Sequence, residues 1–195
     1  MALLYPGRTE AERTLGSGRV RLRQPTLADF AEWAALREAN RAFLSPWEPT
    51  WPDDDLTLGA FRRRLRRYQQ EVRSDAARPF FVRRSSDSAL VGACILSNIR
   101  RGVAQIGTLG YWIGEPFARQ GLMSEAVKVA CNFAFDDLGL HRLEAACLPR
   151  NEASQRLLRR IGFAQEGLAR AYLKINGRWE DHILFALLAN DPRSL

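Results

Sequence analysis

Apolar residues follow two different spacings along the chain, and segments with the two spacings alternate. Apolar residues at every second position, or in short continuous runs, predict strands, whereas recurrence every three to four positions predicts helices. The predicted strands are RVRLRQP, PFFVRR, ALVGACILSNI, AQIGTLGYWIG, HRLEAACL, LARAYLKI and WEDHILFALLA. The predicted helices are TLADFAEWAALREA, FRRRLRRYQQEVR, residues 123–134 and NEASQRLLRRIGF. This order predicts an α+β domain with a mixed sheet.

Capping residues mark the ends of the predicted helices. Thr26, with Asp29 at capping-box spacing, opens the first helix, and Asn151 is the expected N-cap of the last. Gly139 and Gly162 are expected to end the last two helices, because glycine readily adopts the left-handed conformation found after a helix.

Turn signals predict how the strands connect. SSDS and RRGV separate three strands between residues 79 and 114, which indicates an antiparallel meander. Asn176 and Gly177 predict a type I′ turn that joins the last two strands as a hairpin. Without repeats or a dividing linker, residues 1–195 are expected to form one domain, with a core of about residues 18–190.

Composition favours a soluble enzyme or binding protein without metals or disulfides. Hydrophobic residues make up 46% of the chain and charged residues 26%, and no apolar run approaches the roughly 20 residues that span a bilayer. We therefore expect a cytoplasmic protein without membrane contact. Cys94, Cys131 and Cys147 lie far apart in apolar surroundings, and His141 and His182 lack metal-ligand spacing or a nucleophilic partner.

The net charge of +7 and the sequence pI near 10.0 favour acidic partners such as nucleotide phosphates, RNA or an acidic peptide. Much of this charge lies in the arginine cluster at 62–67, where apolar residues recur at helical spacing and arginines fill the other faces. The cluster is either a solvated helix face or a weak contact with RNA or the ribosome.

The stretch EPFARQGLMSEA joins a predicted strand to a predicted helix and carries the strongest candidate chemistry. A helix start exposes unpaired N–H groups and a positive partial charge, which together can bind an anion. Gly121 permits close approach of the backbone to a ligand, and Arg119 and Gln120 add charge and donors. Such a junction can also be only a connection between two elements.

This stretch resembles the acetyl-coenzyme A loop of the GCN5-related N-acetyltransferases (GNAT), whose pattern is Arg/Gln-x-x-Gly-x-Gly/Ala. The six positions read ARQGLM here, so Ala118 and Met123 depart from the pattern. The motifs NRAFLSPWEP, GYWIG, GLMSEA, LHRLEA, PRNEASQRLLRRIGF and EGLARAYLKINGRWEDH are similar to the RimJ/RimL-type ribosomal-protein N-terminal acetyltransferases, most of all the RimJ (ribosomal-protein-alanine) type. The resemblance covers about residues 20–190.

The resemblance implies a GNAT fold and a set of residues that bind acetyl-CoA. The fold has a central, mostly antiparallel, twisted sheet, splayed between its fourth and fifth main strands, with about four helices on both faces. The pyrophosphate is expected on the loop and helix start, and the pantetheine arm beside the strand before them and near the last helix. The implied cofactor-binding residues are Trp112, Ile113, Arg119, Gln120, Gly121, Leu122, Met123, Ser124, Asn151 and Ser154.

The expected chemistry is direct attack of an amine on the thioester. The resemblance places Ser154 near the thioester sulfur, where its hydroxyl can protonate the leaving thiolate. A backbone N–H of GYWIG is expected to polarise the carbonyl. Because an α-amine has a pKa of about 7.7 to 8.0, it must first lose a proton. Glu48 in FLSPWEP is the candidate base, and it could equally be a surface carboxylate.

Other residues on the acceptor side have weaker assignments. Glu144 and Asp181 are alternative bases that more simply pair strands or form salt bridges. Trp47 and Tyr172 are expected to contact the acceptor; Tyr172 is also a second candidate acid, and a half-buried strand aromatic is the simpler interpretation. Cys147 lies near the same pocket in related sequences and is expected to be an inert apolar residue.

Three functions remain open from the sequence. The first is acetylation of a protein N-terminus, specifically the N-terminal alanine of a ribosomal protein, and the second is acetylation of a small amine such as an antibiotic, polyamine or amino acid. The third is a ribosome-assembly or RNA-binding factor that keeps the fold without activity. The chain is expected to be a monomer or a homodimer.

Overall fold

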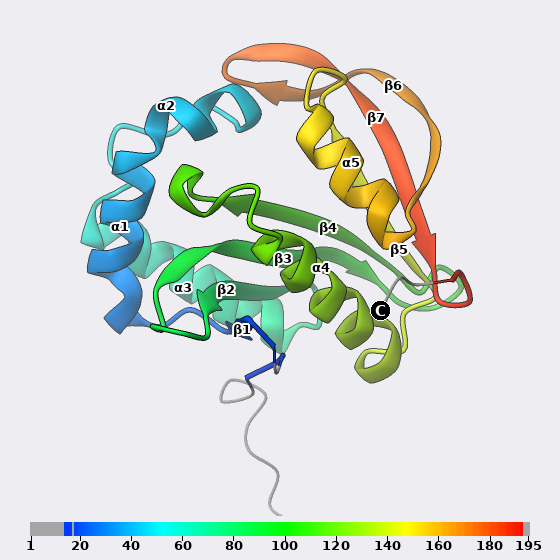
Figure 1. The fold of residues 1–195 in the computed structure, drawn as a ribbon, viewed down its shortest axis with the longest axis horizontal. Coiled ribbons are helices and arrows are strands. Elements are labelled where there is room, and N and C mark those ends of the chain that lie inside the picture. The colour runs from blue at the N-terminus through cyan, green and yellow to red at the C-terminus, as the bar shows by residue number, and fades with distance from the viewer. Residues whose placement is uncertain (1–13, 17, 193–195) are drawn as a thin grey trace, which may run out of the picture.

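The computed structural model describes residues 14–16 and 18–192, and its described strands form one seven-stranded sheet (Figure 1). The strands are β1 (Val20–Arg23), β2 (Arg78–Arg84), β3 (Leu90–Arg100), β4 (Ile106–Ile113), β5 (Arg142–Cys147), β6 (Ala164–Ile175) and β7 (Arg178–Leu188). Their order across the sheet is β1-β2-β3-β4-β5-β7-β6. All neighbouring pairs are antiparallel except β4 and β5, which are parallel. The expected mixed, mostly antiparallel sheet is confirmed.

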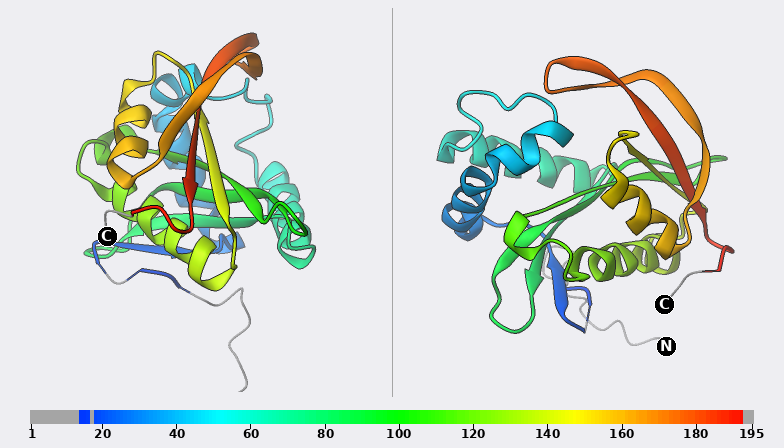
Figure 2. Two further views of the ribbon diagram at one scale, coloured as in Figure 1. Left: turned by 90° about the vertical axis from the view of Figure 1, so that its right-hand side faces the viewer. Right: turned by 45° about the horizontal axis from the view of Figure 1, so that its top comes forward.

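Helices cover both faces of this sheet (Figures 1 and 2). The described helices are α1 (Phe30–Ala39), α2 (Arg41–Leu44), α3 (Leu58–Arg73), α4 (Leu122–Asn132) and α5 (Glu152–Ile161). The larger apolar core lies between the sheet and helices α4 and α5. A smaller core around Trp33 and Phe61 lies between the sheet and helices α1 and α3, where the two rings are 4.9 Å apart. The two faces can therefore carry different binding surfaces.

The sheet opens between β4 and β5. Pairing between these parallel strands is limited to 106–108 against 142–144, although β4 continues to Ile113 and β5 to Cys147. Beyond Thr108 the two strands diverge, which leaves main-chain groups of β4 without a strand partner on that side. The predicted splay is confirmed, and it creates a gap bordered by β4, β5 and the N-terminal ends of α4 and α5.

The hairpin of β6 and β7 has the predicted turn. Asn176 and Gly177 have φ values of 43° and 81°, so both occupy the left-handed region that a type I′ turn requires. The α4 helix ends differently from the expected simple stop: it widens into a π-helical turn over Phe133–Asp137 before Gly139, whose φ is 64°.

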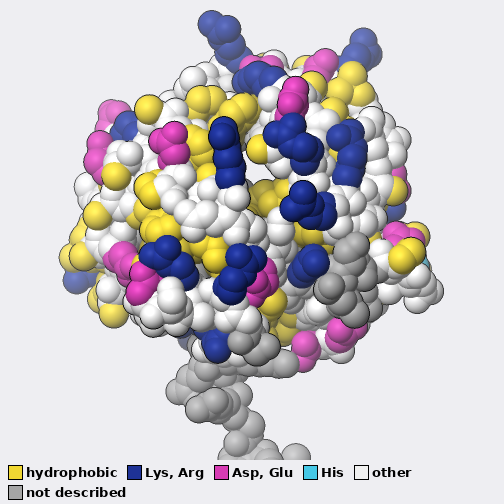
Figure 3. All heavy atoms as spheres, viewed as in Figure 1, with side chains coloured by type: hydrophobic (Ala, Val, Ile, Leu, Met, Phe, Trp, Pro, Cys, Tyr) yellow, Lys and Arg dark blue, Asp and Glu magenta, His cyan; other side chains and the backbone are white. Residues whose placement is uncertain are grey.

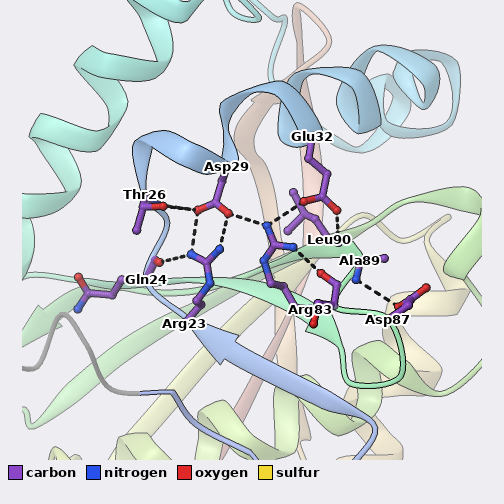
Figure 4. Close-up of polar contacts among 10 residues, drawn as sticks. Arg23, Gln24, Thr26, Asp29, Glu32, Arg83, Asp87, Ala89 and Leu90 are labelled. Carbon is purple, nitrogen blue, oxygen red and sulfur yellow. Dashed lines mark hydrogen bonds and ion pairs between the residues drawn. The ribbon is translucent and has the colours of Figure 1, made fainter.

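An ion-pair network centred on buried Asp29 joins the first helix to the first two strands (Figure 4). Asp29 is 1% exposed and accepts hydrogen bonds from Arg23, from the Thr26 main chain at 2.7 Å, and from Arg83 at 2.6 Å. Arg83 also contacts Glu32 at 2.8 Å. The predicted capping box of Thr26 and Asp29 is thus present, and it opens a 3-10 turn, Leu27–Asp29, directly before α1.

No helix among the described residues is long and apolar enough to span a membrane. Within the same residues, His, Cys, Asp and Glu side chains form no group of three that could hold a metal ion.

Candidate active site

The loop between β4 and α4 exposes a set of unpaired backbone donors. Arg119 and Gly121 have φ values of 60° and 79°, and α4 begins directly afterwards. The first helical hydrogen bond is donated by Glu125 to the Gly121 carbonyl at 3.1 Å, and within the described residues the N–H groups of 121–124 have no acceptor. These groups and the positive end of the helix form an anion site.

Arg19 supports this loop from the segment before β1. Its guanidinium donates to the Gln120 carbonyl at 3.0 Å and to Glu125 at 3.1 Å. A Cβ at Gly121 would lie 3.0 Å from the Arg19 guanidinium. Gly121 is therefore required by its backbone conformation and by this close contact. Sequence analysis missed Arg19, because nothing near residue 19 marks a partner about 100 positions away.

Positive side chains gather on the face of the molecule that carries α4 and α5. Lys and Arg gather over α4 and α5 on the face of the molecule seen in Figure 3. The Arg119 and Gln120 side chains are exposed at the mouth of the loop. The resulting field favours a polyanionic ligand on this face.

The pairing of β4 with β3 determines which main-chain groups face the gap. The Gly114 N–H donates to Val91 on the β3 side at 2.9 Å, and a Cβ at Gly92 would come within 2.1 Å of the Trp112 carbonyl oxygen. Since successive residues of a strand alternate in direction, the main-chain groups of Ile113 face the gap and those of Trp112 face β3. The register favours Ile113 over Trp112 for main-chain pairing with an extended ligand.

The start of α5 places a hydroxyl group on the other side of the gap. Asn151 is the N-cap of α5, as predicted, and its side chain accepts a hydrogen bond from the Ser154 N–H at 3.1 Å. The Ser154 hydroxyl lies 2.7 Å from the Tyr111 hydroxyl on β4. Sequence analysis identified Asn151 and Ser154 but missed Tyr111, whose partner is 43 residues further along.

Burial determines the protonation of the groups around Ser154. Burial raises the pKa of the Tyr111 phenol strongly, and the hydrogen bond with Ser154 lowers it only in part. Burial also raises the pKa of the Cys147 thiol, again with an opposing effect from Ser154. Both groups are therefore neutral at physiological pH. A protonated thiol is a poor nucleophile, which favours direct transfer over a mechanism through an acyl-cysteine.

Glu48, the candidate base, is held by an arginine and a tryptophan. Its two oxygens accept hydrogen bonds from Arg37 at 2.7 and 2.6 Å, and Oε2 also accepts from the Trp51 indole at 2.7 Å. The Arg37 guanidinium is 3.9 Å from the Trp51 ring centroid and 5.0 Å from that of Trp112. Arg37 belongs to α1 and is only 5% exposed. Through its contacts with Glu48, Trp51 and Trp112, it connects α1 with the loop after α2 and with strand β4. Sequence analysis missed Arg37 and Trp51.

The tip of the β6–β7 hairpin contacts the main chain of Glu48. The Asn176 N–H donates to the Glu48 carbonyl at 2.9 Å, and the hairpin reaches toward α2 (Figures 1 and 2). Arg150 forms an ion pair with Glu180 of β7 at 3.1 Å and lies 6.0 Å from the Trp47 ring centroid. Trp47 is thus brought beside Glu48 and the hairpin.

The other sequence candidates have local partners. Glu144 forms an ion pair with Arg142 at 3.1 Å, and Asp181 accepts from the Ala171 N–H at 2.7 Å. Both contacts match the simpler interpretation given to these carboxylates. Tyr172 lies on strand β6 and is 48% exposed, close to the half-buried position expected, and its ring lies 5.7 Å from that of buried His182.

Comparison with known proteins identifies the family. Residues 19–164 match the family described as Acetyltransferase (GNAT) domain. The chain belongs to the GNAT acetyltransferases. This GNAT acetyltransferase is 38% identical over 165 residues to the Probable N-acetyltransferase YjcK of Bacillus subtilis (strain 168), covering 85% of the chain and 91% of that protein.

Two further relatives carry a ribosomal description. The chain is 35% identical over 152 residues to the ribosomal protein uS5-alanine N-acetyltransferase of Escherichia coli (strain K12), covering 78% of each protein. The solved structure of Mycobacterium smegmatis RimJ in complex with CoA-disulfide has 30% identity and a TM-score of 0.86, covering 91% of this chain and 88% of that chain. The RimJ/RimL resemblance found in the sequence is confirmed.

The observed site fits the cosubstrate of this GNAT acetyltransferase, acetyl-CoA. The unpaired N–H groups at the start of α4 suit a pyrophosphate, and the opening beside Ile113 suits an extended, peptide-like arm. Acetyl-CoA supplies the activated acetyl group as a thioester. The protein's own groups have to orient the thioester and bind the amine. They also have to remove a proton from the amine and supply one to the leaving sulfur.

Proposed function

We propose that this acetyltransferase modifies the N-terminal α-amine of a ribosomal protein whose first residue is alanine. The observation that carries this proposal is the similarity to the uS5-alanine N-acetyltransferase, which extends over 78% of both chains. The family match over residues 19–164 includes both Glu48 and the loop at 119–124.

The charges on the acceptor side also support a peptide over a polycationic small molecule. Glu48 is neutralised by Arg37, and Glu180 is paired with Arg150. A site for a polyamine or aminoglycoside would need several unpaired carboxylates, because each ammonium group must be compensated. Trp47, Trp51 and Trp112 instead provide apolar and aromatic surface close to Glu48. Such a surface suits a short, uncharged N-terminal segment.

The proposal assigns roles to the residues around the gap. The loop at 119–124, with the main chain of Ile113 in β4 and with Asn151 of α5, holds acetyl-CoA. Ser154 donates to the leaving sulfur, and Tyr172 and Trp47 contact the acceptor chain. A carboxylate offers about four acceptor sites, and three of those of Glu48 are used, so one site on Oε1 remains for the amine.

Glu48 can serve the amine in two ways through this remaining site. It accepts the proton as general base, or it orients the amine while water removes the proton. In both roles the two hydrogen bonds from Arg37 keep the carboxylate in a fixed orientation. We propose the base role, and the pH–rate profile of Glu48→Gln distinguishes it from the orienting role.

Mass spectrometry of ribosomal-protein N-termini, from cells with and without this protein, tests the proposed acceptor. We expect one alanine-initiated ribosomal protein to lose its acetyl group in the deletion strain and to regain it with the wild-type gene. A Gly121→Ala gene should restore it poorly, which links the modification to the cofactor site. Unchanged N-termini, together with acetylation of a small amine by the purified enzyme, would reject the proposal.

A weak contact with ribosomal RNA through the 62–67 cluster belongs to the same proposal. Arg63, Arg64 and Arg67 pair with carboxylates of this chain. Arg62 and Arg66 form no ion pair within the described residues, so they carry the charge available to a partner. Replacing both with glutamine should reduce ribosome co-sedimentation at low salt while leaving peptide acetylation unchanged. Equal co-sedimentation at low salt would exclude the contact.

A further inference from the structure

Tyr111 and Ser154 form a hydroxyl pair that bridges the gap in the sheet. Tyr111 belongs to β4, and Ser154 lies in the first turn of α5, on the β5 side. Their oxygens are 2.7 Å apart, within the range of a good O–H···O hydrogen bond. Asn151 fixes the main chain of Ser154 at the same time. The serine hydroxyl is therefore held at a defined place where the two strands separate.

The surroundings indicate which hydroxyl donates. Ser154 is the hydrogen-bond partner of the Tyr111 phenol within the described residues, and the partly buried tyrosine packs against the larger core. If Ser154 donated to Tyr111, the phenol hydrogen would be buried without an acceptor, which is unfavourable. If Tyr111 donates, both groups are satisfied. The serine hydrogen can then be donated to another acceptor, and the Cys147 sulfur, which interacts with Ser154, competes with the CoA sulfur for it.

We propose that Tyr111 is a positioning residue for Ser154: its phenol donates to Ser154 Oγ and directs the serine hydrogen toward the sulfur of the leaving CoA. This inference rests on the proposed role of Ser154 in acetyl transfer. Hydrogen bonds in a chain polarise one another, so donation by Tyr111 makes the serine hydroxyl a better donor. Tyr111 itself keeps its proton throughout the reaction.

The atoms of the transfer balance without a change at Tyr111. The amine nitrogen forms a bond to the acetyl carbon, and the carbon–sulfur bond breaks with its electron pair staying on sulfur. The amine loses one proton, and the thiolate takes up one proton. Ser154 lowers the barrier by hydrogen bonding to sulfur while its negative charge develops, which is when such a bond is strongest.

Three variants test whether the effect of Tyr111 on kcat requires Ser154: Tyr111→Phe, Ser154→Ala and the double variant. We expect Tyr111→Phe to lower kcat about tenfold, the effect of one well-placed hydrogen bond, with KM for acetyl-CoA changing less than about twofold. The double variant should be no slower than Ser154→Ala, because Tyr111 acts only through that serine. Tyr68→Phe, a half-buried tyrosine of α3, is the matched control and should be unchanged.

A binding measurement tests the same inference without any acceptor. CoA and desulfo-CoA, which lacks the sulfur, are titrated against the wild type and Tyr111→Phe by calorimetry. The pH is set above that at which the thiol ionises, roughly 8.5 for a typical thiol. We expect Tyr111→Phe to bind CoA about tenfold more weakly and desulfo-CoA equally well. A general disturbance of the site would weaken both ligands alike.

The outcomes separate this inference from the proposed function. If the wild type does not acetylate an alanine-initiated peptide, the proposed acceptor is wrong, but the comparison of CoA with desulfo-CoA still tests Tyr111. The inference is overturned if Tyr111→Phe leaves the ratio of the two affinities unchanged. It is also overturned if the losses of the two single variants multiply in the double variant.

Discussion

The main-chain N–H of Asn176 donates a 2.9 Å hydrogen bond to the carbonyl of Glu48. This bond joins the tip of the β6–β7 hairpin to the loop that follows α2, across more than 120 residues of sequence. The side-chain carboxylate of the same Glu48 is fixed by Arg37. The proposed acceptor side therefore includes a hairpin turn as well as the helices before it.

Gly177→Ala is expected to weaken acceptor binding through this turn. Gly177 has a φ of 81°, so alanine strains the turn by about 1 kcal/mol and displaces Asn176 from Glu48. We expect KM for an alanine-initiated peptide to rise roughly tenfold, as for a loss of about 1.4 kcal/mol in binding, with KM for acetyl-CoA unchanged. Steady-state kinetics with each substrate varied in turn measures both values.

Gly102→Ala is the matched control for the hairpin variant. Gly102 also has a positive φ, 67°, with no atom within 4 Å of an added Cβ, and it lies between β3 and β4 at the other end of β4. Gly102→Ala should lower the free energy of unfolding about as much as Gly177→Ala and leave both KM values unchanged. If both variants raise KM for the peptide equally, the Asn176–Gly177 turn has no specific part in binding the acceptor.

Gly121→Ala is expected to impair cofactor binding. The substitution strains a φ of 79° and brings a Cβ to 3.0 Å from the Arg19 guanidinium that supports the loop. We expect the Kd for CoA to rise more than tenfold, because the N–H groups at the start of α4 lose their alignment. The rise in melting temperature that CoA causes should shrink accordingly.

Gly139→Ala tests whether strain alone explains that loss. Gly139 follows the other end of the same helix, with a φ of 64° and no atom within 4 Å of an added Cβ. It should lower stability by about 1 to 2 kcal/mol and leave the Kd for CoA unchanged. Equal Kd changes in the two variants would mean that Gly121 has no special part in the site.

Glu48→Gln separates the two roles proposed for this carboxylate. If Glu48 is the base, kcat/KM falls strongly and loses the limb that reports its ionisation in the free enzyme. If Glu48 only orients the amine, kcat/KM falls and the shape of the pH profile stays the same. Glu180→Gln, which removes another carboxylate paired with an arginine on this side, should keep the wild-type profile. A wild-type profile for Glu48→Gln would remove Glu48 from the proton-transfer step.

Sequence patterns identified the parts of the site whose signals are local. Gly121 stands between a strand and a helix, and Asn151 is recognisable as an N-cap three residues before Ser154. The meander and the Asn176–Gly177 turn were also predicted, because alternation and turn chemistry involve neighbouring residues. The splay of the sheet came from the family resemblance, since no local pattern encodes it.

Contacts between distant residues could not be found in this way. Tyr111 was placed on a predicted strand, but its hydroxyl meets Ser154 43 residues later, and Arg19 meets Glu125 106 residues later. Arg37 looked like an ordinary polar residue of an amphipathic helix. Its burial between two tryptophans depends on how α1 packs against β4. Such pairs follow from tertiary packing, which a single sequence does not reveal.

Asp29→Asn is expected to lower the stability of the protein in a pH-dependent way. Burial raises the pKa of Asp29, but the hydrogen bonds from Arg23, Thr26 and Arg83 outweigh it, and the pKa falls from 3.8 to about 2. Because the folded-state pKa is below the unfolded value, the stabilisation is present above about pH 4 and is lost as pH falls toward 2. It amounts to about 2 kcal/mol at neutral pH.

Urea unfolding of the wild type and Asp29→Asn between pH 3 and pH 7 measures this difference. We expect the gap in unfolding free energy to be largest at neutral pH and to shrink below about pH 4, since protonated Asp29 resembles asparagine. Asp87→Asn is the control: burial hardly affects this exposed carboxylate, whose pKa is lowered to about 2 by Arg84. Its effect should be much smaller because solvent screens an exposed pair. If the difference in unfolding free energy between the wild type and Asp29→Asn stays constant with pH, the charge of Asp29 does not contribute to stability.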